Sequence, residues 1–144
     1  MTTPTPIQPQ AQTSYTAATI LLAHGSTDPK WLEPFNGMLE QIRAGLSSER
    51  VELAFMELAE PSLEGQIRSL ATDGFQRIEI LPLFFAAGRH LRKDVPAMIE
   101  AVQHELHDAG QNTEIILQKP IGLDPEVASA IQRIVIRQIK ASET

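Results

Sequence analysis

The chain has 144 residues, a formal net charge of −6 and no cysteine. This length suits one domain with a substantial core, and the lack of cysteine excludes disulfides and thiolate-bound metal, so any metal must be held by nitrogen or oxygen. The acidic balance without an extended basic face argues against nucleic acid as the main partner, and no apolar run approaches the roughly 20 residues of a membrane span.

The N-terminal stretch at residues 1–18 contains three prolines, many Thr and Gln residues and no charged side chain. This composition is typical of a disordered tail. The stretch lacks the positive start and the apolar block of about 7–15 residues that a secretory signal has. We therefore predict a disordered tail at residues 1–18, a single domain at residues 19–144 and a cytoplasmic location.

Along the rest of the chain, short apolar runs alternate with apolar residues at helical spacing. Strands are predicted at residues 19–23, 51–58, 77–83 and 114–118. Helices are predicted to begin between Trp31 and Pro34, after Ser62, near Asp94 and at Asp124. The resulting βαβαβαβα order predicts an α/β fold, a four-stranded parallel sheet in a three-layer αβα domain with helices on both faces.

Proline contributes to the start signals of the first and last helices. Proline is tolerated in the first turn of a helix, so Pro34 places the start of the first helix shortly before it. In the last helix, Asp124 is the expected N-cap before Pro125 and Glu126. One apolar stripe, expected of a helix that covers the sheet, follows this cap. Its members are Val127, Ile131, Ile134, Val135 and Ile139.

Polar residues fall at the predicted ends of three strands. His24 follows the first strand, Glu57 ends the second, and His90 lies in the loop after the third. Because parallel strands end at one edge of the sheet, these side chains can converge. Two imidazoles and a carboxylate can bind a divalent metal or accept protons. The alternatives are a turn cap for His24, a solvated strand end for Glu57 and a surface anion site for His90.

The loop after the third strand reverses the sign of the local charge. Gly88 ends an apolar run, and Arg89, Arg92 and Lys93 surround His90 in an otherwise acidic chain. A glycine-bearing loop after a buried parallel strand is a usual place for a ligand. The cations are therefore expected either to hold an anion or to form an ordinary solvated loop.

Two other pairs of residues allow more than one interpretation. Phe84 and Phe85 are adjacent, so they point to opposite faces, and the pair could support a flat ligand or belong to the core. His104 and His107 are three residues apart on a helix, a spacing that could bridge a metal. Both fall off the apolar side of that helix, so we predict that they face solvent.

Nucleotide-binding motifs are absent from the sequence. There is neither a Gly-x-Gly-x-x-Gly nor a Gly-x-x-x-x-Gly-Lys pattern, which argues against a nicotinamide-dependent or ATP-driven enzyme. A histidine phosphatase would place an arginine directly before His24, where Ala23 stands.

Four segments together resemble the CbiX/SirB family, the class II sirohydrochlorin chelatases. They are residues 21–26 (LLAHGS), 54–62 (AFMELAEPS), 81–96 (LPLFFAAGRHLRKDVP) and 120–125 (PIGLDP). The resemblance implies a chelatase-like domain with strand order 2-1-3-4 and the insertion of cobalt or iron into a tetrapyrrole without ATP. It also implies that His24 and His90 bind the metal and that Glu57 is the family's strand-two glutamate. The family includes nickel-inserting members, and the preference for Co²⁺ over Fe²⁺ or Ni²⁺ rests on the resemblance alone.

The implied chemistry suits these residues. Insertion displaces pyrrole protons, and neutral imidazole can bind a metal or accept a proton near pH 7. His24 and His90 are thus the predicted catalytic residues, with Glu57 as a ligand or orienting base. The metal is a substrate, and no permanently bound cofactor is expected. The residues expected to bind the polycarboxylate sirohydrochlorin are Arg89, Arg92, Lys93, Ser26 and Gly88.

Longer members of the family consist of two similar halves, and this chain has the length of one. The resemblance therefore implies a homodimer with a shared cavity, in which Leu91 and Phe85 are the expected interface residues. Two other functions remain open on the sequence alone. One is a metal or tetrapyrrole carrier without turnover, and the other is a phosphate-ester enzyme with His24 as nucleophile.

Overall fold

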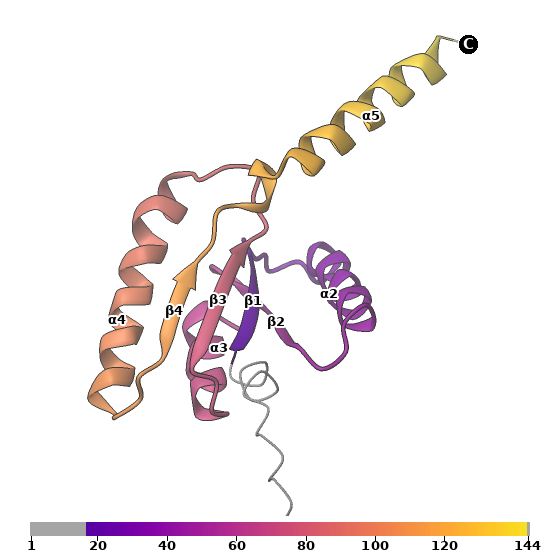
Figure 1. Cartoon of the computed structure of the whole chain (residues 1–144). Coiled ribbons are helices and arrows are strands. Elements are labelled where there is room, and N and C mark those ends of the chain that lie inside the picture. Colours follow the sequence, from indigo (N-terminus) through magenta and orange to yellow (C-terminus); the bar gives the residue numbers. More distant parts are fainter. Residues whose placement is uncertain (1–16, 144) are drawn as a thin grey trace, which may run out of the picture.

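The computed structural model of the protein describes residues 17–143, so the predicted tail lies, up to residue 16, outside the described residues. Four strands form one parallel sheet in the order β2-β1-β3-β4 (Figure 1). The strands are β1 (Ala17–Ala23), β2 (Arg50–Phe55), β3 (Arg77–Pro82) and β4 (Glu114–Leu117). The predicted α/β fold and strand order are confirmed, although β1 begins two residues earlier than predicted.

Six helical segments connect or follow the strands. They are α2 (Pro29–Ala44), α3 (Leu63–Thr72), the π-helical turn η1 (His90–Asp94), α4 (Val95–Asp108), the 3-10 turn η2 (Ile121–Leu123) and α5 (Pro125–Ser142). Within residues 17–143, none of these helices has the length and apolar character needed to cross a membrane.

The alternating side chains of β1 divide the core into two layers. Ile20 and Leu22 pack with α3 and α4 on one face of the sheet, whereas Leu21 and Ala23 pack with α2 on the other. This division follows from the two-residue period of a strand. Because β1 lies between β2 and β3, the residue that follows it emerges in the middle of the carboxyl edge.

The predicted start of α2 is wrong. The helix begins at Pro29, where the Asp28 side chain accepts a hydrogen bond from the Lys30 backbone N–H at 3.0 Å. Pro34 lies inside the helix. Lys30 and Pro34 are both exposed, so the Lys30 carbonyl that Pro34 cannot bond is open to water, and the helix tolerates the proline in its second turn.

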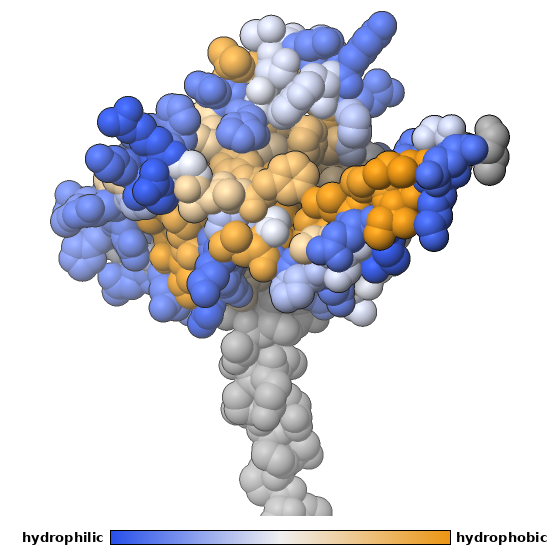
Figure 2. Space-filling view, turned by 90° about the horizontal axis from the view of Figure 1, so that it is seen from above, coloured by the Kyte–Doolittle hydropathy of each residue, from blue (hydrophilic) through white to orange (hydrophobic). Residues whose placement is uncertain are grey.

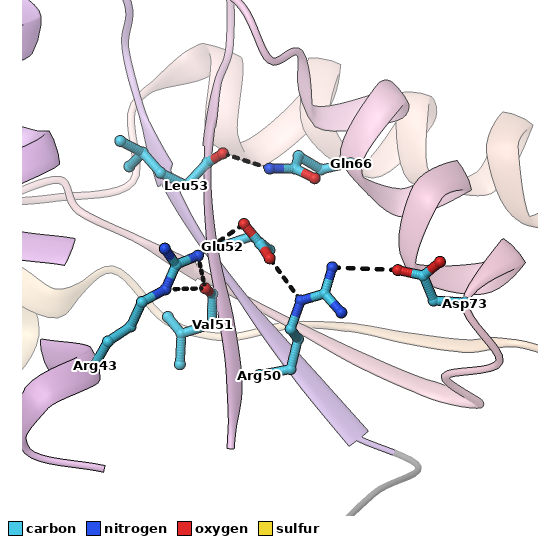
Figure 3. Close-up of polar contacts among 7 residues, drawn as sticks. All are labelled: Arg43, Arg50, Val51, Glu52, Leu53, Gln66 and Asp73. Atoms are coloured by element: carbon cyan, nitrogen blue, oxygen red, sulfur yellow. Dashed lines mark hydrogen bonds and ion pairs between the residues drawn. The ribbon is translucent and has the colours of Figure 1, made fainter. Parts of the chain in front are cut away.

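Side chains from both helical layers cover the free edge of β2 (Figure 3). The Arg43 guanidinium donates to the Val51 carbonyl, with Nε at 3.0 Å, and Gln66 donates to the Leu53 carbonyl at 2.9 Å. Arg50 bridges Glu52 and Asp73. These contacts satisfy carbonyls that an edge strand otherwise leaves open to pairing with another chain.

The last helix does not cover the sheet as predicted. Its start is confirmed, because the Asp124 side chain accepts from the Glu126 N–H at 2.9 Å. The helix then projects away from the domain (Figure 1), and none of its residues is buried. The periodicity had correctly indicated an apolar face but not the surface against which it packs.

Candidate active site

His24 leaves the end of β1 and rests on an aromatic ring. Its imidazole is stacked on Phe84, with ring centroids 4.2 Å apart and an angle of 24° between the planes. Phe84 is buried, whereas His24 is exposed. The core therefore holds one face of the imidazole and leaves its ring nitrogens available at the carboxyl edge of the sheet.

The turn after β1 touches the loop that carries Glu57. The Glu57 N–H donates to the His24 carbonyl at 3.1 Å. Gly25 has φ +100°, and a Cβ atom there would lie 1.8 Å from the Glu57 carbonyl oxygen. Only glycine fits this approach without a shift of the backbone. The structure thus brings the His24 and Glu57 segments together through their main chains.

Glu57 lies in this loop and not in the strand, so the predicted strand at residues 51–58 extends too far. The Phe55 N–H donates to the Pro61 carbonyl at 2.9 Å, which turns the chain away from the sheet after β2. Leu58 then has φ +64°, a conformation outside the strand region. Glu57 is exposed beside the turn that follows β1.

His90 opens the π-helical turn η1, and the prediction that it lies in a loop is wrong. Its Nδ1 atom lies 2.6 Å from Oδ2 of Asp94, four residues later. An ionised carboxylate only accepts hydrogen bonds, so in the neutral imidazole this contact puts the N–H at Nδ1 and the lone pair at Nε2. Asp94 is a site residue that sequence reasoning missed. Asp94 follows His90 by four residues, a spacing that would have indicated the pair if the helix had been predicted to begin at His90.

The three predicted ligands share an edge without forming a ready-made ligand set. Among residues 17–143, no group of three or more His, Asp or Glu side chains is close enough together to hold a metal ion. His24 and Glu57 are joined through main-chain contacts, and His90 stands separately on η1. Ion binding at this edge would therefore require side-chain movement or additional ligands.

The predicted cations surround His90. Arg89, Arg92 and Lys93 are exposed, and no carboxylate within the described residues forms an ion pair with any of them. The Gly88 carbonyl accepts from the Arg92 N–H at 3.0 Å, which begins the helical path. The structure leaves the three positive charges available to an anionic ligand.

Ser26, also predicted to bind substrate, has a local partner. Its hydroxyl oxygen accepts from the Asp28 N–H at 3.0 Å. This contact shapes the turn between β1 and α2. The hydroxyl hydrogen is not used in this contact, so the group can still donate to a ligand.

The two adjacent phenylalanines have different environments. Phe84 is in the core, whereas Phe85 is 74% exposed. A Cβ at Gly122 would lie 2.2 Å from the Phe85 backbone, and the Gly122 N–H donates to the Phe84 carbonyl at 2.9 Å. This glycine lets η2 press against the segment that presents Phe85. Figure 2, which looks down on this edge, shows apolar side chains over its middle and along α5.

One predicted interface residue and the second histidine pair can now be placed. Leu91 is 4% exposed and packs in the core, so it is not available to an interface as predicted. His104 and His107 are exposed on α4, as predicted. The His107 Nδ1 atom lies 3.3 Å from the Asn112 side-chain oxygen.

The family model of CbiX matches residues 18–138 of the chain. The sequence is 30% identical over 140 residues to the sirohydrochlorin cobaltochelatase of Methanopyrus kandleri, covering 85% of this chain and 94% of that protein. It is 28% identical over 123 residues to the sirohydrochlorin cobaltochelatase of Sulfurisphaera tokodaii, again covering 85% and 94%.

Solved structures share the fold. A cobalamin biosynthesis CbiX protein from Marinobacter aquaeolei VT8 matches with a TM-score of 0.72 and 41% identity, covering 87% of this chain and 98% of that one. SirB from Bacillus subtilis with Fe³⁺ matches with a TM-score of 0.71 and 29% identity, covering 82% and 45%. SirB from subspecies spizizenii in complex with cobalt gives 0.71 and 28%, covering 82% and 49%. The chain thus spans about half the length of either SirB.

Proposed function

The chain belongs to the CbiX family, and on this premise we propose that it inserts a divalent metal ion into sirohydrochlorin without ATP. The observation that carries the proposal is that His24, stacked on Phe84, and the His90–Asp94 pair follow neighbouring strands at one edge of the sheet. Both histidines are exposed there. We propose Co²⁺ as the ion, because the matching proteins of Methanopyrus kandleri and Sulfurisphaera tokodaii are named cobaltochelatases.

Metal insertion requires two kinds of work from this site. Two macrocycle N–H bonds break as metal–nitrogen bonds form, and the two protons must pass to basic groups. The Nε2 of His90 and the exposed ring of His24 can each bind the incoming ion or, once the ion has passed to the macrocycle, accept a proton. Asp94 fixes the orientation of the His90 ring through Nδ1. Glu57 supplies a nearby carboxylate as a further ligand or as a base.

The substrate's own charge gives the unpaired cations a role. Sirohydrochlorin carries carboxylates around its rim, and Arg89, Arg92 and Lys93 lie next to His90 without ion-pair partners in the described chain. Guanidinium groups bind carboxylates in a bidentate manner and attract anions over a distance. The exposed Phe85 offers an apolar surface for the flat ring.

We further propose that the working unit is a homodimer of single domains. One edge supports the macrocycle from one side only, whereas ring chemistry benefits from the exclusion of water. The half-length match to SirB leaves room for a second copy opposite the first. Phe85 remains a candidate for this shared cavity, and the buried Leu91 does not.

A turnover assay tests the proposed activity. Purified protein is mixed anaerobically with excess sirohydrochlorin and Co²⁺, without ATP, and the absorption change of the macrocycle is followed. A chelatase converts many equivalents per chain, faster than the protein-free background. A carrier would stop at about one equivalent, and that outcome would overturn the proposal. Parallel reactions with Fe²⁺ and Ni²⁺ compare the metals, whose intrinsic affinities for such ligands follow the general divalent order.

A further inference from the structure

Helix α5 presents an apolar face that the described chain leaves uncovered. Five of its apolar residues are between 41% and 56% exposed, and all but Ile136 fall on one side: Ile131, Ile134, Val135 and Ile139. At 3.6 residues per turn these side chains share one side of the helix, and they form a stripe broad enough to face a core. Figure 2 shows the apolar atoms running along this helix, bordered by polar ones. A face of this kind is normally buried against another surface.

The sheet has an uncovered face as well. On the side where α2 packs over β1 and β2, a hollow of about 640 Å³ lies over the β3–β4 half of the sheet. It is lined by Thr19 of β1, Glu79 and Leu81 of β3 and Gln118 after β4. No helix of residues 17–143 fills this groove, because α3 and α4 pack on the opposite face. The uncovered half of this face lies beside α2, where a second helix would complete the layer.

The short link before α5 directs the helix away from its own groove. The Gly122 N–H donates to the Phe84 carbonyl at 2.9 Å, and the Asp124 N–H donates to the Ile121 carbonyl at 3.0 Å. Asp124 also caps α5, so no free linker separates η2 from the helix. Folding back onto its own sheet would require breaking the cap or η2.

We propose that α5 docks in the β3–β4 groove of a second copy of this chain, which returns its own α5 to the first. The groove begins beside Ile121 and Leu123, at the base of α5. Two chains related by a two-fold axis near this point can therefore exchange helices reciprocally. In such an exchange, the helix and the groove that receives it are both present in every copy of the chain.

Size supports a second copy as the occupant. Arg133, Arg137 and Lys140 lie on the side of α5 away from the stripe, so they would face solvent when the stripe is docked and the contact itself would be apolar. Each exchanged helix is about 27 Å long, and the exchange duplicates the contact, so each helix has to supply only about half of the 1,200–2,000 Å² that a stable interface buries.

The exchange also bears on the proposed site. Helix α5 leaves from the carboxyl edge that carries His24 and His90 (Figure 1). Pairing through α5 would bring the two edges to the same region of the dimer. The pairing itself does not depend on metal chemistry, so its test is independent of the insertion assay.

Light scattering after size exclusion tests the docking face. The wild-type chain should have about twice the mass of 15.9 kDa. Ile134→Glu should halve the mass at the same concentration, with the circular dichroism of the folded domain retained. Ile136→Glu is the matched control, because Ile136 is 53% exposed but lies off the stripe, and this variant should stay dimeric. A monomeric wild type, or equal masses for the two variants, would overturn the proposal.

Cysteine cross-linking identifies the groove, since the chain has no cysteine of its own. Chains with Ile134→Cys are mixed with chains carrying Thr19→Cys or Gln118→Cys and treated with a short bis-maleimide. Covalent dimers should form in these mixtures but not with Asp108→Cys, on the end of α4. A chain that carries both Ile134→Cys and Thr19→Cys is treated in the same way. Linkage only between two Ile134→Cys chains, or only within one doubly substituted chain, would contradict docking in the partner's groove.

Discussion

His90 Nδ1 and Asp94 Oδ2 lie 2.6 Å apart across one turn of η1. The pair is exposed, with 65% of the histidine side chain and 59% of the aspartate side chain accessible. The contact therefore orients a ring at the surface and does not stabilise the core. This is the arrangement in which a carboxylate sets the tautomer of a metal-binding histidine.

The Asp94→Asn substitution should weaken metal use more than folding. An amide can donate to Nδ1, which favours the wrong tautomer and a poorer Nε2 ligand, and loss of such a partner typically costs 10–100-fold in metal affinity or activity. The apparent KM for Co²⁺ in the insertion assay measures this effect. Glu100→Gln, an exposed carboxylate on α4, is the control. An unchanged KM in Asp94→Asn would show that the pair has no positioning role.

The Arg89→Ala/Arg92→Ala double variant should raise the apparent KM for sirohydrochlorin. Removing two unpaired cations weakens attraction for the polycarboxylate, so the salt dependence of kcat/KM should also decrease. Arg77→Ala removes a charge at the opposite end of β3 and serves as the comparison. If both variants show the wild-type salt dependence, the cations form only a solvated loop.

Gly25→Ala should lower the free energy of unfolding by about 2 kcal/mol or more, because the residue has a positive φ and its Cβ would meet the Glu57 carbonyl. Gly37→Ala, inside α2 with no heavy atom near its Cβ, should instead raise stability by about 0.5–1 kcal/mol. Urea unfolding of both variants measures the contrast. Equal effects would mean that the close approach of the two loops does not constrain residue 25.

The ion pair between α3 and α4 should make stability depend on acid. Arg68 Nε lies 2.7 Å from Glu105, and hydrogen bonds from Arg68 hold the pKa of Glu105 below its ordinary value of 4.5. The contribution of this carboxylate is thus fully present above that value and is lost as the pH falls through the lower folded pKa. Glu105→Gln should have a lower melting temperature than wild type at pH 7. The difference should vanish in strong acid, and a constant difference would contradict the assignment.

The sequence was informative where local chemistry decides the structure. Asp124 before Pro125 marked the start of α5. The same Asp-Pro pattern at residues 28–29 marks the start of α2, but the preference of proline for the first turn had placed that start nearer to Pro34. The stacking of His24 on Phe84 depends on two strands meeting, which no local pattern encodes. The periodicity of α5 likewise indicated an apolar face without indicating what covers it.

The positions of the predicted site residues are described by the structure, whereas their roles are not. The structure places His24, Glu57 and His90 at one edge, as parallel topology requires, but their catalytic and metal-binding roles stay predictions. Asp94 was missed because its contact depends on a π-helical turn. Such turns are rare, and propensity alone does not reveal them.

The most direct test of the central claim is the initial rate of Co²⁺ insertion by His24→Ala and His90→Ala, compared with His104→Ala. His104 is an exposed histidine on α4, away from the carboxyl edge. Each site variant should lose at least about a hundredfold in rate, toward the protein-free background, while His104→Ala keeps the wild-type rate and all three remain folded. Wild-type rates in both His24→Ala and His90→Ala would contradict the account.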